Sequence, residues 1–216
     1  MHAGFPCFTR EMNTVLRLGA REGEGDMPHL LDRVGGTLLA HGMAVLLKLG
    51  FGFIMRDSLL DEEQDRKARD FFRENFEIRD PGAPNGTRYY QGKFLIRTKK
   101  PGDDMNVYLR FCPRPEALFK RTPSGRTLQP SAVVSVEALT EEEAERVEGD
   151  PGQVDMVIRF KDLKAITGLV GRPDVDVIQL MLENVVQMSG NVGHLFKFGA
   201  IAKNIELALG VCAAEN

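Results

Sequence analysis

The four histidines of the chain are the side chains best suited to proton transfer near neutral pH. His2 lies near the start of the sequence, and His29 and His41 lie in an apolar segment interrupted by glycines. His194 opens the last expected helix, beside Lys197. None shares a short motif with a Cys, Ser or Asp that would pair a nucleophile with its base, and no two have the helical spacing of metal ligands. The sequence therefore predicts no catalytic residues and no metal, and a charged pair beside His194 in a pocket would instead favour a small enzyme.

The three cysteines also suggest no chemistry. Cys7, Cys112 and Cys212 are odd in number and far apart, which predicts neither a disulfide framework nor a zinc site. The first residues, Met1 to Asn13, lack a basic start followed by an apolar stretch and a small-residue cleavage site. We therefore expect a cytoplasmic protein.

One glycine-containing motif stands where phosphates bind in several folds, between an expected strand and an expected helix. Gly190-Asn191-Val192-Gly193 lacks both the glycine phasing of a dinucleotide site and the Lys-Ser/Thr ending of a P-loop. The motif predicts a turn, and no cofactor is expected.

A basic, aromatic stretch from Arg88 to Arg126 is typical of RNA-binding segments, but the overall composition argues against that function. The 216 residues carry a formal net charge of -3. Residue alternation assigns the rings of this stretch to the core and its cations to a solvated face, which the acidic run Glu137–Asp150 partly neutralises. We expect no nucleic acid partner, although the basic face suits a transient contact with anionic lipid headgroups. The core set includes Phe94 and Phe111, and the solvated set Lys93, Arg97 and Arg110.

Helical periodicity appears at both ends of the chain. Thr37–Met55 is long enough for a membrane span, but internal charges and glycines favour a buried or interface helix pair within Leu30–Met55. Ser58–Asn75 is an expected surface helix with favourable charge pairs. Near the carboxyl end, Asp162 is placed to cap a helix, Val175–Asn184 is a short apolar helix, and a last helix runs to Leu209.

Between these helices the apolar residues alternate as in strands. The turn chemistry at Lys99–Asp104 predicts an antiparallel hairpin, and we expect four consecutive strands to form a meander, with a fifth short strand at Val185–Met188. The four strands are centred on Tyr90–Arg97, Val107–Phe111, Ala132–Leu139 and Val154–Phe160, and Glu148–Gly152 is expected to be a turn or loop.

Residues Val154–Phe198 resemble the C-terminal half of the sterol carrier protein type two family. The resemblance rests on the segments VDMVIRFKD, LKAITGLVG, DVIQLMLEN and VVQMSGNVGHLFKF, with a strand ending in an acidic residue, a Leu-rich helix closed by glycine, and a Ser/Thr-Gly-Asn-x-Gly turn. The matching residues are Asp162, Leu163, Ile166, Leu169, Gly171, Met188, Ser189, Gly190, Asn191 and Gly193. Asp174, Asp176 and Asn184 depart from the family pattern, as does the length of the last helix.

This resemblance implies an α+β fold: a mostly antiparallel, curved, five-stranded sheet covered on one face by helices, with an apolar tunnel between them for a fatty acyl chain, a sterol or another lipid. We expect this domain at residues 56–216, preceded by a partly helical N-terminal extension at 1–55. The expected function is non-catalytic binding or transfer of such a ligand. The alternative is a dimerisation or interaction module, or an accessory subunit, whose pocket is filled, with a homodimer formed through the N-terminal helices. The expected lining is Phe94, Ile96, Ile158, Ile166, Leu169, Met181, Met188, Leu195 and Phe198.

Overall fold

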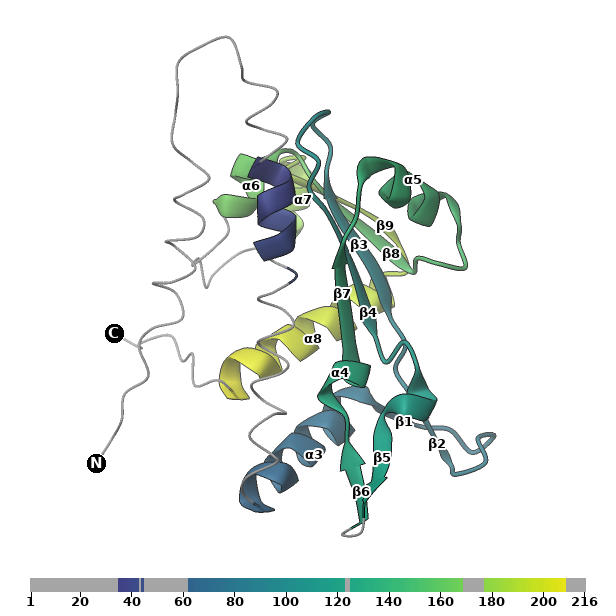
Figure 1. The fold of residues 1–216 in the computed structure, drawn as a ribbon. Helices are drawn as coiled ribbons and strands as arrows, with labels where there is room; N and C mark the ends of the chain where they lie inside the picture. Colours follow the sequence, from purple (N-terminus) through teal and green to yellow (C-terminus); the bar gives the residue numbers. More distant parts are fainter. Residues whose placement is uncertain (1–34, 43, 45–61, 123–124, 169–176, 209–216) are drawn as a thin grey trace, which may run out of the picture.

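The computed structural model describes residues 35–42, 44, 62–122, 125–168 and 177–208, and these form an α+β fold (Figure 1). Besides the helical residues 35–42, the helices are α3 (Glu62–Phe76), α4 (Pro130–Val133), α5 (Glu141–Gly149), α6 (Leu163–Thr167), α7 (Val177–Leu182) and α8 (Val192–Ala208), with a 3-10 turn at Pro115–Ala117. The strands are β1 (Glu77–Arg79), β2 (Thr87–Tyr89), β3 (Lys93–Thr98), β4 (Asn106–Phe111), β5 (Phe119–Thr122), β6 (Gly125–Leu128), β7 (Val134–Ala138), β8 (Met156–Phe160) and β9 (Val186–Gly190).

The central element is a five-stranded mixed sheet with strand order β7-β4-β3-β8-β9. The expected hairpin is present, because β3 and β4 pair antiparallel with Lys93 opposite Arg110. The expected four-strand meander is wrong. After β7 the chain crosses over through α5 and returns as β8 parallel to β3, with Phe94 opposite Met156. Alternation of residues identifies strands but not their partners, and a parallel partner requires a crossover of this kind.

The sheet is open and is not curved, contrary to the expectation of a curved sheet. Curvature in a sheet is introduced by bulges or glycine kinks. The ladders between β3 and β4, β3 and β8, β4 and β7, and β8 and β9 each run in one unbroken register. These strands therefore contain no bulge that would bend the sheet.

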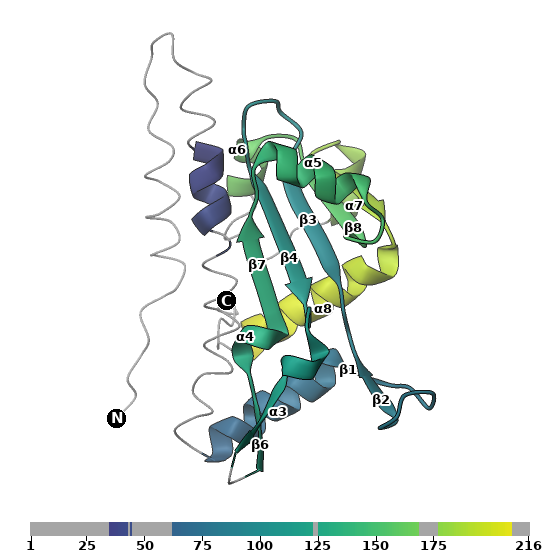
Figure 2. The same cartoon turned by 45° about the vertical axis from the view of Figure 1, so that its right-hand side comes forward.

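Helices lie on both faces of the sheet, so the expectation of cover on one face is corrected as well. Figure 2 shows α5 in front of the strands and α8 behind them. Under α5 lies a small core of Leu95, Tyr108, Ala144, Val147 and Val157, and the main core occupies the other face. The helix α5 forms because Thr140 and Glu143 cap its start in a reciprocal capping box.

Charged residues hold α5 on the sheet. Arg97, expected on a solvated face, is only 8% exposed. Its guanidinium forms ion pairs with Glu141 and with Glu148, the latter at 2.7 Å, and Glu148 also pairs with Arg159. Asn106 donates a hydrogen bond of 2.9 Å to Glu141. The acidic run therefore neutralises part of the basic face as expected, and it buries Arg97, which was expected to be solvated.

The helical residues 35–42 belong to the same core as the sheet. Ala40 and Ala44 are buried in the main hydrophobic cluster. Gly36 lies against the β3–β4 turn so closely that a Cβ there would be 1.3 Å from the carbonyl oxygen of Asp103. The boundary expected after residue 55 stays a prediction, but these residues pack as part of the core.

This contact predicts a difference between two adjacent glycines. Gly36→Ala should lower the free energy of unfolding by at least about 2 kcal/mol, because the added methyl forces the helix away from the turn. Gly35→Ala is the matched control, since its Cβ would meet only Leu163 Cδ1 at an ordinary 3.9 Å. The control should raise stability by up to about 1 kcal/mol through helix propensity. Urea denaturation of both variants measures the difference, and equal stabilities would contradict the packing of this helix.

Candidate ligand-binding site

The expected lining residues fall into three groups in the structure. Phe94, Ile96, Ile158 and Ile166 are buried in the main core. Met188, Leu195 and Phe198 are half-buried and pack on that core from β9 and α8. Met181 is 42% exposed on α7, and Leu169 lies outside the described residues.

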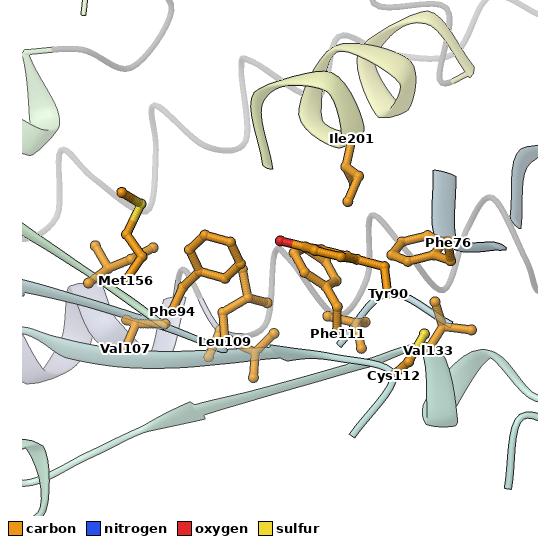
Figure 3. Close-up of a cluster of buried hydrophobic side chains, with 14 of the residues drawn as sticks. Phe76, Tyr90, Phe94, Val107, Leu109, Phe111, Cys112, Val133, Met156 and Ile201 are labelled. Carbon is orange, nitrogen blue, oxygen red and sulfur yellow. The ribbon is translucent and has the colours of Figure 1, made fainter. Parts of the chain in front are cut away.

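Aromatic side chains occupy the space between the sheet and the middle of α8 (Figure 3). The ring centroids of Phe94 and Phe198 are 5.2 Å apart, and those of Phe94 and Phe111 are 5.9 Å apart. Phe76 of α3 continues the row beside Phe111 at 5.6 Å, and Ile201 of α8 closes it from above. These rings, the aromatic block, fill the part of the space between sheet and helices where the expected tunnel would run under the middle of α8, so a ligand has to lie to one side of them.

Half-buried apolar residues lie beside the aromatic block, toward the β8–β9 edge. Met188 on β9 stands opposite the buried Ile158 of β8 in the ladder. Leu163 of α6 and Leu180 of α7 are also half-buried and pack against the same core. We call this set, Leu163, Leu180, Met188 and Leu195, the apolar layer, whereas Phe198 belongs to the aromatic block. Half-burial leaves part of each side chain in contact with solvent, and an apolar ligand would cover it.

The Ser189–Gly193 motif places α8 against the sheet. Gly190 has φ +119° and its Cβ position lies 2.2 Å from the carbonyl oxygen of Asp155, so only glycine fits there. The Asn191 backbone amide donates to that same carbonyl at 3.2 Å, and the Asn191 side chain accepts a hydrogen bond from the Gly193 amide at 2.8 Å. Ser189 and Gly190 lie in β9, so the turn expected from Ser189 is shorter than predicted, and the chain passes through Asn191 directly into α8, whose first residues lie over β3.

A polar group of Tyr90, His194 and Lys197 results from this placement. The Tyr90 hydroxyl and His194 Nδ1 form a hydrogen bond of 2.8 Å, and the Lys197 ammonium lies 5.9 Å from the centroid of the Tyr90 ring. Burial, and secondarily the negative charge of Asp155, raise the pKa of Tyr90, so the phenol stays protonated. Burial lowers the pKa of Lys197. We call these three residues the polar cluster.

Sequence reasoning noted His194 beside Lys197 but missed Tyr90, which is 104 residues away. No local motif connects the two, because their proximity depends on the turn at Gly190 and on the position of β3 in the sheet. A protonated phenol, an imidazole and an ammonium group can bind a polar atom of a ligand. The described part of the chain holds no group of three His, Cys, Asp or Glu residues suited to a metal. Burial raises the pKa of the Cys112 thiol to about 12, which disfavours the reactive thiolate.

Comparison with family models, with curated proteins and with solved structures found no match for this chain. The class that the structure defines is an α+β protein with a five-stranded mixed sheet. Among the described residues, no helix has the length and apolar character needed to cross a membrane. Most of the segment Thr37–Met55 lies outside those residues.

Proposed function

We propose that this protein binds or transfers an apolar ligand, such as a fatty acyl chain or another lipid, on the apolar layer between α6, α7, α8 and the β8–β9 edge. The observation that carries the proposal is that Met188 and Leu195, two of the expected lining residues, are half-buried and pack on the main core from β9 and α8. The resemblance of Val154–Phe198 to sterol carrier proteins supports the same ligand class. The aromatic block is an end wall of the site in this proposal.

The apolar part of the binding free energy scales with the number of ligand methylenes that leave water. Each methylene of an acyl chain that leaves water contributes about 0.8 kcal/mol. Association costs about 4 to 15 kcal/mol of this gain. A ligand with an acyl chain of common fatty-acid length therefore binds at best with micromolar affinity. Such affinity suits a protein that must also release its ligand.

A thermal-shift titration tests the proposal directly. Protein freed of bound lipid by organic-solvent extraction and refolding should show a melting temperature that rises with the concentration of dodecanoate, added below its micelle-forming concentration, because a ligand of the folded state stabilises it by mass action. Mass spectrometry of the solvent extract would identify any lipid that co-purified. A melting temperature unmoved by saturating dodecanoate would refute ligand binding.

A pair of substitutions locates the ligand. Met188→Gln keeps the length of the side chain but places a polar amide in the apolar layer, and should weaken dodecanoate binding about tenfold because lost apolar contact is not replaced. Ile78→Gln is the control, since Ile78 is also half-buried but lies on β1, away from β9 (Figure 1). Equal affinities of the two variants would place the ligand elsewhere.

A second candidate function, self-association, is favoured by large exposed apolar residues on the helices that flank β9. Leu182 of α7 is 79% exposed, and Phe196 of α8 is 74% exposed. Exposed apolar side chains of this size serve as interface residues where they lie together on the surface. Sedimentation of the whole chain tests this function: a dimer that Phe196→Ser converts to monomer would support it. Deletion of residues 1–55 is a poor test, because it removes the buried Ala40 and Ala44.

A further inference from the structure

We infer that two copies of the chain associate through the outer edge of β9, which pairs antiparallel with its own copy across a two-fold axis and joins two sheets into one. This inference rests on the second candidate function, self-association, and names the surface through which it occurs. The partner is a second copy of this chain rather than a strand of another protein.

Strand β9 lies at one end of the sheet, and within the part of the chain that the structure describes no strand pairs with its outer side. The ladder with β8 determines which backbone groups point outward. Just before β9, the Lys161 amide donates to the Val185 carbonyl at 2.8 Å, and just after it the Asn191 amide donates to the Asp155 carbonyl at 3.2 Å. In an antiparallel ladder such bonded pairs recur at every second residue, so the residues between them direct their N–H and C=O groups away from β8.

The outward-directed residues are Val186, Met188 and Gly190, which are spaced evenly about Met188. An antiparallel copy of β9 centred on this residue places Met188 opposite Met188 and Val186 opposite Gly190. Every outward N–H of one copy then meets an outward C=O of the other, as in the hydrogen-bonded pairs of an ordinary antiparallel ladder. The edge is therefore complementary to its own copy, which a two-fold interface requires.

The side chains of β9 do not oppose this pairing. The strand has the sequence VQMSG and contains neither a charged residue nor a proline, two of the features by which proteins protect an edge strand. In the inferred register Gln187 of one copy lies opposite Ser189 of the other, and both are neutral, so no like charges meet. The opposite edge of the sheet differs, since β7 carries the charged Glu137.

Exposed apolar side chains lie beside the same edge. The helix α7 contacts β9, and the Val185 amide donates to the Leu180 carbonyl at 2.9 Å where the helix leads into the strand. At this end of α7, Leu182 is 79% exposed and Met181 is 42% exposed. A second copy along β9 lies next to these side chains, and their removal from water adds a driving force to the modest net gain from backbone hydrogen bonds.

Paired charge substitutions on the full chain test the inferred register. Gln187→Glu combined with Ser189→Glu places carboxylates opposite one another across the axis, and should raise the dimer dissociation constant about tenfold or more. Gln187→Glu combined with Ser189→Lys is the matched control, because it places a carboxylate opposite an ammonium and should keep the dimer. Sedimentation equilibrium over a series of protein concentrations measures each dissociation constant, and melting temperatures show that the variants fold.

These substitutions leave the apolar layer untouched. Side chains alternate along a strand, so Gln187 and Ser189 lie on the face of the sheet opposite that of Met188. On that face the Arg159 guanidinium donates to Ser189 Oγ at 3.3 Å. The melting temperature of both variants should therefore rise with dodecanoate as it does for the unsubstituted protein, which keeps this test independent of apolar ligand binding.

Hydrogen exchange gives a second measurement that needs no substitution. In the dimer the amides of Val186, Met188 and Gly190 are bonded to the other copy, so their exchange should slow as the protein concentration rises. The amides of Gln187 and Ser189 are directed toward β8 in the ladder and serve as the internal reference.

The outcomes separate the inferred interface from self-association as such. A dimer that resists the two carboxylates, or outward amides whose exchange does not depend on concentration, would overturn pairing through β9 and leave association through another surface. Equal weakening of the dimer in the folded glutamate–lysine control would also overturn the inferred pairing. A chain that stays monomeric at every concentration would overturn self-association itself.

Discussion

Replacing Phe111 by alanine is expected to lower the free energy of unfolding by about 3 to 5 kcal/mol. Phe111 is 1% exposed, and its ring contacts those of Phe76, Tyr90, Phe94 and Phe198, which come from α3, the segment before β3, β3 itself and α8. Removal of the ring leaves a void that four surrounding rings can only partly fill. Chemical denaturation with a linear extrapolation to water measures the loss.

Phe196→Ala is the matched control for this prediction. It removes the same kind of ring, but Phe196 lies on α8, is exposed and is not among the residues packed against the main core. The stability of the control should change by no more than about 0.5 kcal/mol. A Phe111→Ala variant as stable as the control would mean that the aromatic block is not packed, and would restore the possibility of a tunnel along the whole of α8.

Replacing Arg97 by alanine is expected to lower the free energy of unfolding by about 3 kcal/mol and to loosen α5 from the sheet. Loss of one partner from a buried ion pair costs about 3 to 5 kcal/mol, because the remaining charge is buried without compensation. The expected loss is at the lower end, since the side chain of Glu141 is 47% exposed and regains water. Hydrogen exchange of the α5 amides would show whether this helix opens before the rest of the protein.

The corresponding control is Arg73→Ala on α3. Arg73 pairs with Asp70, but both side chains are more than half exposed, and such pairs contribute about 0 to 1 kcal/mol. Added salt should also weaken the effect of Arg73 more than that of Arg97, because buried charges are less screened. Similar losses in the two variants would contradict the burial of Arg97 beneath α5.

Much of the local structure was predictable because it depends on neighbouring residues. The turn at Lys99–Asp104 joins two alternating segments, and β3 and β4 form the predicted hairpin. Asp162 caps α6, where its side chain accepts a hydrogen bond from the Ala165 amide at 2.8 Å. The helix α5 had a readable signal as well, since Thr140 and Glu143 have the spacing of a capping box. The predicted turn at Glu148–Gly152 overlaps only the end of that helix.

The pairing of strands was not predictable from alternation. The same pattern of apolar residues lets β8 pair with β7 in a meander or cross to β3, and the structure has the second arrangement. The pairing of β8 with β3 instead of β7 depends on the helix α5 between the two strands. The apolar residues of α5 are buried only when this helix packs on a face of the sheet. The crossover through α5 also buries Arg97. In the sequence, Arg97 occupies a position like that of any solvated residue on an amphipathic strand.

By itself the sequence determined the class of the protein, the strand and helix segments near the carboxyl end, and the apolar character of the residues that form the proposed site. Only the tertiary structure decided that Phe94, Phe111 and Phe198 fill the space under α8, and that Tyr90 meets His194 across 104 residues of chain. The physical reason is the separation along the sequence over which each kind of interaction acts. Capping, turn chemistry and periodicity act over a few residues, whereas the packing of α8 depends on how the turn at Gly190 directs that helix over strands formed much earlier in the chain.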